Sequence, residues 1–352
     1  MNKTMSLAAL ASLALAAGSI APAVAEDMTV VGFGGLIQDW SRTAYWQPFA
    51  KMTGIHLVED TRDYGIGVIR TKVEGGANTW DVVSAEDIEV IQGCEEGLFQ
   101  KLDWSKITGS ASFGPGGKLP CGLAQIIYAM NLVYDGNRIK GDQPKTWVDF
   151  WNLQKWPGKR TMYKDPRDAL EIALIADGVA RDDVYKVLAT PSGVDRAFSK
   201  LDAIKSNVLW WSNPGASRQM LISGDATLAA TFGNAVINMN RQQHTNFKAS
   251  FQDQVLHTDY FAIIKGTRHL ASAEKLMNFY SQAEPQAKFS QMSGAGVPNK
   301  DALPLIQKAD PEVAAVLNNT PEHLAISLRS DAQFWLEHYD DLNKRFTAWL
   351  AH

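Results

Sequence analysis

The sequence is poor in several features that mark common classes of protein. Only two of its 352 residues are cysteine, and 38 acidic residues outnumber 34 lysine and arginine residues. Nucleic acids and anionic membrane surfaces bind concentrated positive charge, so this balance argues against both as partners. Beyond the N-terminal segment, no stretch approaches twenty apolar residues without a charge, which argues against a membrane-spanning helix.

The serines and histidines lack the spacing of known catalytic sites. Ser217, Ser223 and Ser293 do not occur in the G-x-S-x-G turn of serine hydrolases, and the seven histidines, among them His244 and His257, are scattered. No H-E-x-x-H or comparable metal motif is present, and no histidine is near a cysteine in sequence. We therefore expect a protein without enzymatic activity, cofactor or metal; an exported hydrolase is the alternative.

The N-terminus predicts export, and export bears on the two cysteines. Lys3 precedes an apolar run over residues 7–20, and Ala-Val-Ala then supplies the small residues that signal peptidase reads. This pattern predicts a signal peptide over residues 1–25. In an oxidising compartment we expect Cys94 and Cys121 to form a disulfide, with two separate thiols as the alternative.

Short apolar runs alternate with helical patterns along the chain. Strands are expected at residues 28–32, 55–58, 80–83, 126–130, 160–162, 227–230 and 260–264, and helices at residues 40–52, 66–74, 170–178, 201–205 and 271–282. A further helix is expected to begin near Pro144 with Thr146 as its N-cap. The alternation is typical of βαβ units, and it predicts two α/β lobes, each built on a mainly parallel sheet.

Two glycines, Gly34 and Gly35, follow the first predicted strand. The third glycine of a dinucleotide-binding G-x-G-x-x-G loop is replaced by Ile37, which weakens a nucleotide interpretation. Glycines at the carboxyl end of a strand can instead leave backbone N–H groups open to a ligand. A plain tight turn is the alternative.

Acidic residues recur at the ends of predicted strands, and aromatic residues accompany them. The acids are Glu86, Asp87, Asp165, Asp168 and Asp259, and the aromatic residues are Trp210, Trp211, Phe232 and Tyr260. Carboxylates and aromatic faces in one site would suit an organic cation. For any one of these acids, an exposed helix cap or ion pair is the alternative.

Several short segments, taken in order, carry a family resemblance. They are FAKMTGI at residues 49–55, WDVV at 80–83, GLFQKLD at 97–103, PKTWVDFW at 144–151, SGD at 223–225 and FAIIKG at 261–266. In these segments the chain resembles the periplasmic solute-binding proteins of ABC importers, specifically the family that includes the spermidine- and putrescine-binding proteins.

The resemblance implies the two-lobed type II periplasmic binding protein fold, with helices flanking each sheet and two hinge strands near residues 128–132 and 257–262. The first lobe would comprise residues 26–130 and 260–303, and the second residues 131–259 and 304–352. Such a protein would close on a solute in the periplasm and deliver it, as a monomer, to an inner-membrane ABC permease. Service to a chemoreceptor stays open.

The resemblance also implies roles for particular residues. Asp259 looks like the acid on the second hinge strand, Glu86 falls near another binding position, and Asp168 falls near the acid that the second lobe contributes. Asp259 and Glu86 would pair with ammonium groups. Trp211 and Phe232 would wall the aliphatic part of the ligand, and Tyr260 would join them.

Two departures from the polyamine binders affect the expected ligand. Asn234 stands where they tend to have an aspartate, and Gly34 and Gly35 stand where they carry aromatic and polar side chains. Asn234 would then hydrogen-bond the ligand. Fewer acids and more N–H groups could favour a zwitterion, with its carboxylate at the glycines and its amine at Asp259. The expected ligand is a polyamine such as putrescine or spermidine; a zwitterionic amino-acid derivative, opine or betaine is the alternative. A ferric-ion binder is disfavoured because no Tyr-Tyr pair occurs.

Overall fold

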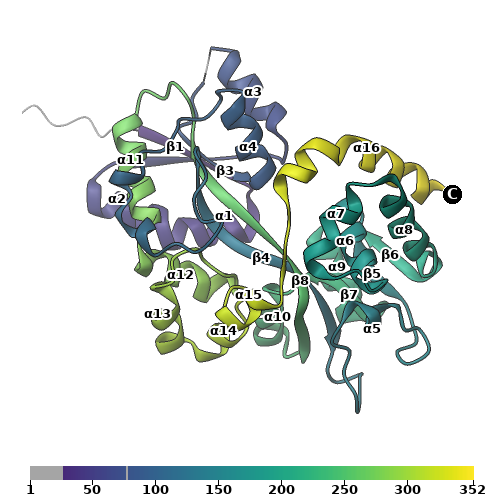
Figure 1. Ribbon diagram of the computed structural model, residues 1–352. Coiled ribbons are helices and arrows are strands. Elements are labelled where there is room, and N and C mark those ends of the chain that lie inside the picture. Colours follow the sequence, from purple (N-terminus) through teal and green to yellow (C-terminus); the bar gives the residue numbers. More distant parts are fainter. Residues whose placement is uncertain (1–26, 77) are drawn as a thin grey trace, which may run out of the picture.

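The computed structural model describes residues 27–76 and 78–352, so the predicted signal peptide lies outside the described residues (Figure 1). The strands are β1 (Asp27–Gly32), β2 (His56–Thr61), β3 (Val82–Glu86), β4 (Gly122–Asp135), β5 (Arg160–Tyr163), β6 (Val208–Trp211), β7 (Leu228–Phe232), β8 (Phe247–Ile263) and β9 (Leu328–Arg329). They pair in the order β2-β1-β3-β8-β4-β7-β5-β6, and β9 pairs with β8.

Helices precede and follow most of these strands. The α-helices are α1 (Gly35–Ser41), α2 (Gln47–Thr53), α3 (Ile66–Glu74), α4 (Asp87–Glu95), α5 (Trp147–Trp151), α6 (Pro166–Ala176), α7 (Val184–Leu188), α8 (Pro191–Asp202), α9 (Pro214–Ser223), α10 (Ala235–Gln243), α11 (Leu270–Tyr280), α12 (Ala283–Ser293), α13 (Ala302–Ala309), α14 (Pro311–Ala315), α15 (Pro321–Ala325) and α16 (Ala332–Ala351). A π-helical turn, η1 (Arg42–Trp46), joins α1 to α2, and short 3-10 turns lie at η2 (Trp104–Lys106), η3 (Thr108–Ser112), η4 (Arg181–Asp183) and η5 (Lys205–Asn207).

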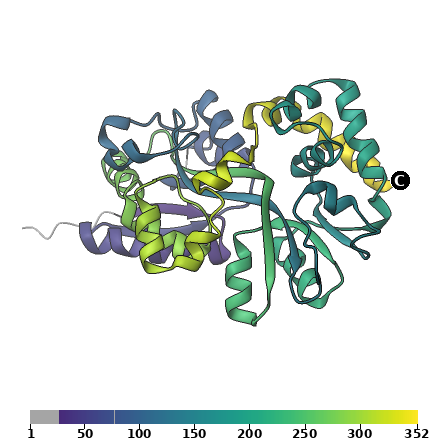
Figure 2. The ribbon, with the colours of Figure 1, turned by 60° about the horizontal axis from the view of Figure 1, so that its bottom comes forward.

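Two long antiparallel strands, β4 and β8, connect two bodies of the molecule. β1 runs parallel to β2 and β3, and β5 runs parallel to β6 and β7. Each parallel trio is antiparallel to the long strand beside it, β3 to β8 and β7 to β4. We call the body on β1, β2 and β3 the first lobe and the body on β5, β6 and β7 the second lobe. The predicted fold class is thereby confirmed, and Figure 2 shows the long strands running between the bodies.

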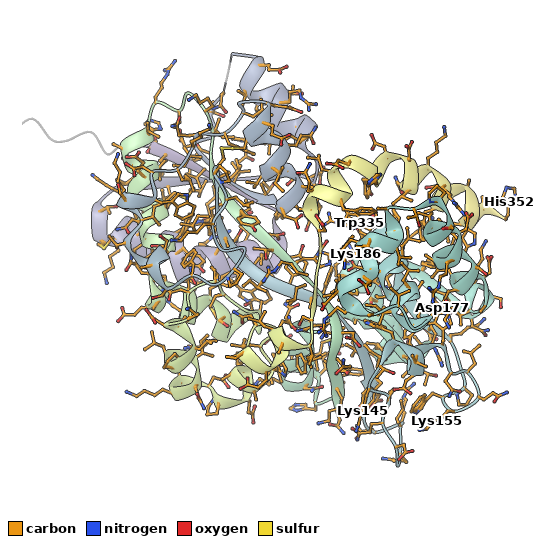
Figure 3. The ribbon with its side chains drawn as sticks, viewed as in Figure 1. Lys145, Lys155, Asp177, Lys186, Trp335 and His352 are labelled. Carbon is orange, nitrogen blue, oxygen red and sulfur yellow. A yellow bond between two sulfur atoms is a disulfide. The ribbon has the colours of Figure 1, made fainter. Side chains whose placement is uncertain are left out.

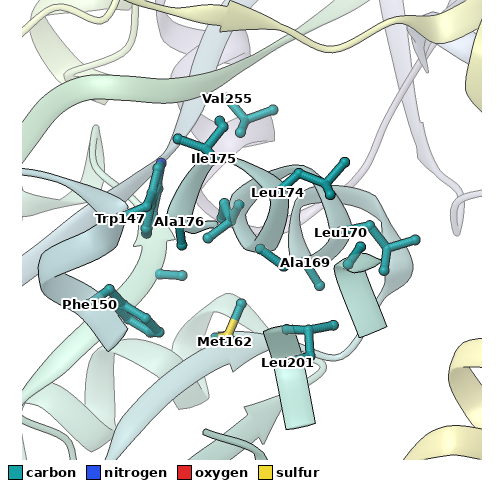
Figure 4. Packing of buried hydrophobic residues seen from close by; sticks show 14 of the residues in the cluster. Trp147, Phe150, Met162, Ala169, Leu170, Leu174, Ile175, Ala176, Leu201 and Val255 are labelled. Atoms are coloured by element: carbon teal, nitrogen blue, oxygen red, sulfur yellow. The ribbon is translucent and has the colours of Figure 1, made fainter. Parts of the chain in front are cut away.

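Each lobe has its own hydrophobic core. Figure 4 shows the second, in which Trp147, Phe150 and Met162 lie against α6. The first contains Met28 and Phe49 and also Ile306, Val313 and Leu317. The packing of α13 and α14 therefore differs from the expected division, which assigned residues 304–352 to the second lobe. The lobe boundaries as a whole remain a prediction.

The C-terminal helix α16 contacts both lobes. It lies against α4 of the first lobe and α6 of the second. Trp335, labelled in Figure 3, donates a hydrogen bond from its indole nitrogen to Glu171 on α6, at 2.7 Å. Ile88, at the start of α4 in the first lobe, packs against the hydrophobic core of the second lobe. The start of α4 is thus held near the second lobe.

Local sequence signals set several element ends. Thr146 accepts a hydrogen bond from the backbone of Asp149, whose carboxylate accepts one from the backbone of Thr146 in return, so the predicted cap of α5 is confirmed. The helix expected at residues 201–205 is wrong, because α8 ends at Asp202 and the chain turns through η5 into β6. The four-residue strand β6 was not predicted.

The two cysteines form the predicted disulfide. Cys94 on α4 is bonded to Cys121, which immediately precedes β4. Cys121 is fully buried in a cluster that includes Phe99 and Val90. The bond ties the helix after β3 to the beginning of the first long strand.

Candidate ligand-binding site

Strand register gathers four polar side chains on one face of the sheet between the lobes. Glu86 of β3 is paired with Asp259 of β8, and Tyr128 of β4 is paired with His257 of β8. Residues opposite each other, or two apart on one strand, point to the same face. Tyr128 donates a hydrogen bond from its hydroxyl to Asp259 at 3.1 Å, and its ring stacks on His257 at 5.4 Å. The long strands therefore carry the centre of the candidate site.

Two carboxyl groups in this cluster are held in an environment that favours protonation. Burial, together with the nearby Glu86 and Asp87, raises the pKa of Asp259 well above its usual range. Burial also raises the pKa of Glu86 to about 7; Arg167 opposes the rise, and Glu89 and Asp87 add to it. A cation bound between them would oppose this shift, because a nearby positive charge favours the ionised form of a carboxyl.

Glu86 is positioned by the turn from β3 into α4. It is the N-cap of α4, and its backbone N–H donates to the Glu89 carboxylate at 2.8 Å. Glu89 is buried and paired with Arg62, with Nη1 and Oε1 at 3.0 Å. Arg62 in turn donates to the backbone oxygen of Ser84 on β3. These bonds fix the strand end that carries Glu86.

The second lobe contributes Arg167 and Asp168 from the beginning of α6. Asp168 has a φ of 68°, in the left-handed region that side chains other than glycine rarely adopt. Its carboxylate lies 2.7 Å from Nε2 of His257, and this contact helps to hold the unusual backbone. Burial lowers the pKa of His257, but the charge and hydrogen bond of Asp168, together with Asp87, raise it, and the net shift is upward.

Arg167 points across the junction between the lobes. Its Nη2 lies 3.3 Å from Oδ1 of Asp87 on α4 and 3.5 Å from Nδ1 of His257. Burial lowers the pKa of Arg167, but the surrounding acids, with Asp87 and Glu86 first, together raise it, and the net shift is upward. The guanidinium is therefore a fixed positive charge beside the carboxyl cluster.

A row of aromatic side chains leads from the second lobe to the cluster. Tyr163 stacks on Trp211 with centroids 4.6 Å apart, Trp211 meets Phe232 edge-on at 5.7 Å, and Phe232 meets Tyr128 edge-on at 5.4 Å. Tyr163, Trp211 and Phe232 are the last residues of β5, β6 and β7. The carboxyl ends of the parallel strands thus supply an apolar wall beside Asp259.

The structure brings some of the expected site residues together. Glu86, Asp168, Asp259, Trp211 and Phe232 belong to one connected network through Tyr128 and His257. Their roles toward a ligand remain predictions.

Other expected site residues lie elsewhere or are already engaged. Tyr260, next to Asp259 on β8, faces the opposite side of the sheet; it is buried in the core and donates to the backbone oxygen of Gly116 at 2.7 Å. Asn234 donates from its amide to the backbone oxygen of Ser293, at 3.4 Å. Gly34 donates its backbone N–H to the Gln38 side chain at 3.1 Å. Gly35 follows it with an exposed backbone.

Sequence reasoning missed Tyr128, Tyr163, Arg167 and His257 as members of the cluster. His257 had a usable signal, because it lies two residues before Asp259 on one strand and must share its face. Arg167 had none beyond its place next to Asp168. Tyr64, stacked on Phe33 at 4.4 Å, was also missed. Burial, and then Asp259 and Glu86, raise the pKa of Tyr64, which places this first-lobe aromatic pair beside the carboxyls.

Within residues 27–76 and 78–352, no group of three histidine, cysteine or acidic side chains could hold a metal ion. None of the helices in the same ranges has both the length and the apolar character that crossing a membrane requires.

Comparisons with known proteins give consistent results. Residues 44–315 match the model of the bacterial extracellular solute-binding protein family. The γ-aminobutyric acid-binding protein of Pseudomonas aeruginosa is 36% identical over 97% of this chain and 96% of its own length. A spermidine/putrescine-binding periplasmic protein of Haemophilus influenzae is 24% identical over 84% of this chain and 83% of its own. The solved structure of a γ-aminobutyric acid receptor, 29% identical, superposes with a TM-score of 0.83 and covers 92% of this chain and 98% of that one.

Proposed function

The chain belongs to the bacterial extracellular solute-binding protein family, as a substrate-binding protein of an ABC importer, and on this premise we propose that its ligand is a small amine-bearing zwitterion. The observation that carries the proposal is the pairing of the buried Asp259 on β8 with the half-buried Glu86 on β3, beside an aromatic wall. A polyamine is the second candidate, because spermidine/putrescine-binding proteins are also relatives.

Asp259 and Glu86 would receive the ammonium group. Burial and neighbouring acids raise the pKa values of both carboxyls, and the nearby Arg167 offsets the rise at Glu86 only in part. An ammonium group placed between them would form charge-assisted hydrogen bonds in a site that is largely shielded from water. Phe232 and Tyr128 would contact the methylene groups beside it, and Asp168 would act through His257.

Two observations favour a zwitterion over a polyamine. The γ-aminobutyric acid-binding relative shares 36% of its residues with this chain, against 24% for the polyamine-binding relative. The cluster also contains the buried guanidinium of Arg167, which repels a second ammonium group and attracts a carboxylate.

Capture would occur by closure of the two lobes in the periplasm, after removal of residues 1–25. A ligand that contacts both lobes binds the closed state more tightly than the open state and so shifts the population toward closure. The closed protein, acting as a monomer, would then present the solute to an inner-membrane permease.

Isothermal titration calorimetry of residues 26–352 tests the proposal. The ligands are γ-aminobutyric acid, putrescine, spermidine, a betaine and an opine-like conjugate. We expect the primary-amine zwitterion to bind with the lowest Kd. Binding of the betaine alone would contradict an ammonium site at Asp259 and Glu86, since a quaternary amine cannot donate hydrogen bonds. An absence of binding to every member would contradict amine capture.

A further inference from the structure

We infer that Arg167 is the anchor for the ligand's carboxylate and that it makes the site select against diamines; this inference rests on the proposed function. Arg167 stands at the beginning of α6 in the second lobe, opposite the carboxyl cluster of the long strands. It was not expected from the sequence. Its position follows from the turn at Arg167 and Asp168, where the backbone departs from helical geometry before α6 becomes regular.

The guanidinium has unused donors. Only Nη2 of Arg167 makes contacts among the described residues, with Asp87 at 3.3 Å and with His257 at 3.5 Å. Neither Nε nor Nη1 donates a hydrogen bond to any residue in the described ranges. A buried guanidinium with donors left over is suited to a carboxylate, because its planar fork can bind both oxygens.

The charges around Arg167 set the kind of ligand that fits. Glu86 and Asp87 act on the guanidinium of Arg167, and so does Asp168, which is itself paired with His257. Asp259 lies beside Glu86 on the neighbouring strand. Burial raises the pKa values of both Glu86 and Asp259, and one ammonium group between them would supply positive charge in place of a proton. A second ammonium group at the far end of a diamine would meet the positive charge of Arg167 in a poorly hydrated site, where like charges repel strongly.

The glycine loop is the weaker candidate for the same role. The N–H of Gly34 is already donated to Gln38, so this backbone offers fewer donors to a carboxylate than its sequence suggested.

Arg218 is a second arginine that could bind the ligand's carboxylate. Arg218 on α9 is half-buried, makes no ion pair with the described residues, and has a pKa that burial lowers. Within the described residues it makes no hydrogen bond or ion pair with the cluster, whereas Arg167 contacts both Asp87 and His257.

Three ligands of similar length distinguish the contributions of the ammonium-binding and carboxylate-binding ends of the site. γ-Aminobutyric acid carries an ammonium and a carboxylate, putrescine carries two ammonium groups, and n-butylamine carries one. Titrations are made with the parent protein and with Arg167→Gln, Arg167→Lys and Arg218→Gln. Arg196→Gln is the matched control, since Arg196 forms an exposed ion pair with Asp177 at 2.6 Å within the second lobe.

We expect Arg167→Gln to lower the affinity for γ-aminobutyric acid by about 30-fold or more, because the carboxylate loses a buried charged partner. The same variant should change the affinity for butylamine much less than that for γ-aminobutyric acid, and it should bind putrescine more tightly relative to butylamine. Arg167→Lys should retain the discrimination against putrescine, because it retains the charge. Arg196→Gln should leave all three affinities unchanged, and circular dichroism verifies that each variant is folded.

Several outcomes overturn the inference. Equal weakening of all three ligands in Arg167→Gln would show a purely structural role, and an unchanged affinity for γ-aminobutyric acid would show no role. If Arg218→Gln, and not Arg167→Gln, selectively weakened the binding of γ-aminobutyric acid, the carboxylate anchor would be Arg218 on α9. Tighter binding of putrescine than of γ-aminobutyric acid by the parent would overturn this inference while leaving amine capture standing. Failure of the parent to bind any of the three contradicts the proposed function itself.

Discussion

The guanidinium of Arg167 lies 3.3 Å from the carboxylate of Asp87, and the two residues belong to different lobes. Both side chains are about nine-tenths buried. An ion pair so placed exists only while the lobes are together, because opening would separate its partners and expose both to water. The pair therefore contributes to the balance between open and closed forms, in addition to any ligand.

Replacing Asp87 by asparagine should shift that balance toward the open form. The substitution leaves the buried charge of Arg167 with one fewer partner, and a buried charge that loses its partner is strongly unfavourable. We expect a larger radius of gyration by X-ray scattering without added ligand. Asp177→Asn, which breaks an ion pair within the second lobe, should leave the radius unchanged. An unchanged radius for Asp87→Asn would rule out a role of the pair in closure.

Asp259→Asn should abolish most amine binding without unfolding the protein. Removing one charged partner of an ammonium group in a buried site weakens binding by about 30-fold or more. Because burial raises the pKa of Asp259, the neutral amide should be tolerated by the fold and the Tm should not fall. Calorimetry and thermal unfolding measure the two effects separately. Asp142→Asn, whose partner Lys155 lies at the surface, is the control. Parent-like affinity in Asp259→Asn would remove this residue from the site.

Amine affinity should increase with pH up to about 7, the pKa of Glu86. Without ligand this carboxyl is largely protonated below that pH, and an ammonium group binds its ionised form, so binding releases protons. His257 acts in the same direction, because it gains positive charge as the pH falls. Each carboxyl that must ionise adds up to about tenfold per pH unit. Asp87, Glu89 and Arg167 also face the cluster and shape the curve.

Calorimetry in two buffers of different ionisation enthalpy counts the released protons. Glu86→Gln should flatten the dependence near pH 7 and reduce proton release. The raised pKa also means that the ligand-free fold binds this proton more tightly than the unfolded chain does. Its contribution to stability should therefore decline as the pH rises from about 4.5 to 7. A pH-independent affinity between these values would contradict the assignment of Glu86.

Loss of the disulfide should destabilise the first lobe. Cys94 and Cys121 are 27 residues apart, and closing a loop of that length corresponds to about 3.5 kcal/mol on the chain-entropy estimate. We expect the free energy of unfolding of the double serine variant, measured by denaturant titration, to be lower by this amount. Thiol reductant should lower the stability of the parent to the same level and leave the variant unaffected. Equal stability of the parent and the variant would show that the bond constrains little.

Gly294, the residue after α12, can be compared with Gly97 to distinguish the steric cost of an added Cβ from the cost of its backbone conformation. Its φ is 69°, and a Cβ there would lie 2.5 Å from the backbone oxygen of Asn234. Gly97 has a similar φ of 74°, but a Cβ there meets none of the described atoms within 4 Å. Gly97→Ala should lower the free energy of unfolding by about 1 kcal/mol, because alanine disfavours the left-handed backbone. Gly294→Ala should lower it clearly more, because its Cβ also meets a backbone oxygen. Urea unfolding measures both, and equal losses would show that α10 can yield at Asn234.

Much of the fold could be predicted from local patterns. The alternation of apolar runs and helical segments indicated parallel half-sheets, and Thr146 was recognisable as a helix cap. Elements with weak local signals were missed. β6 has four residues, and the first part of β8 is only partly buried and carries polar residues such as Lys248 and Gln252, so it lacks an apolar run.

The candidate site was predicted in part. Asp259 and Glu86 were identified, but Tyr260 was assigned to the wrong face, although strand alternation places neighbours on opposite sides. Arg167 was missed because an arginine at the start of a helix gives no sign of being buried. Its environment depends on Asp87, which comes from the other lobe.

Short-range interactions made most strands and helices predictable, together with the cap of α5 and, with only two cysteines, the thiols that can pair. The tertiary structure alone decided which charges meet. Glu86 opposes Asp259 because of the register between β3 and β8, and Arg167 reaches Asp87 because two lobes come together. Register and burial arise from contacts between segments distant in sequence, and burial is what shifts a carboxyl's pKa and makes a single guanidinium decisive.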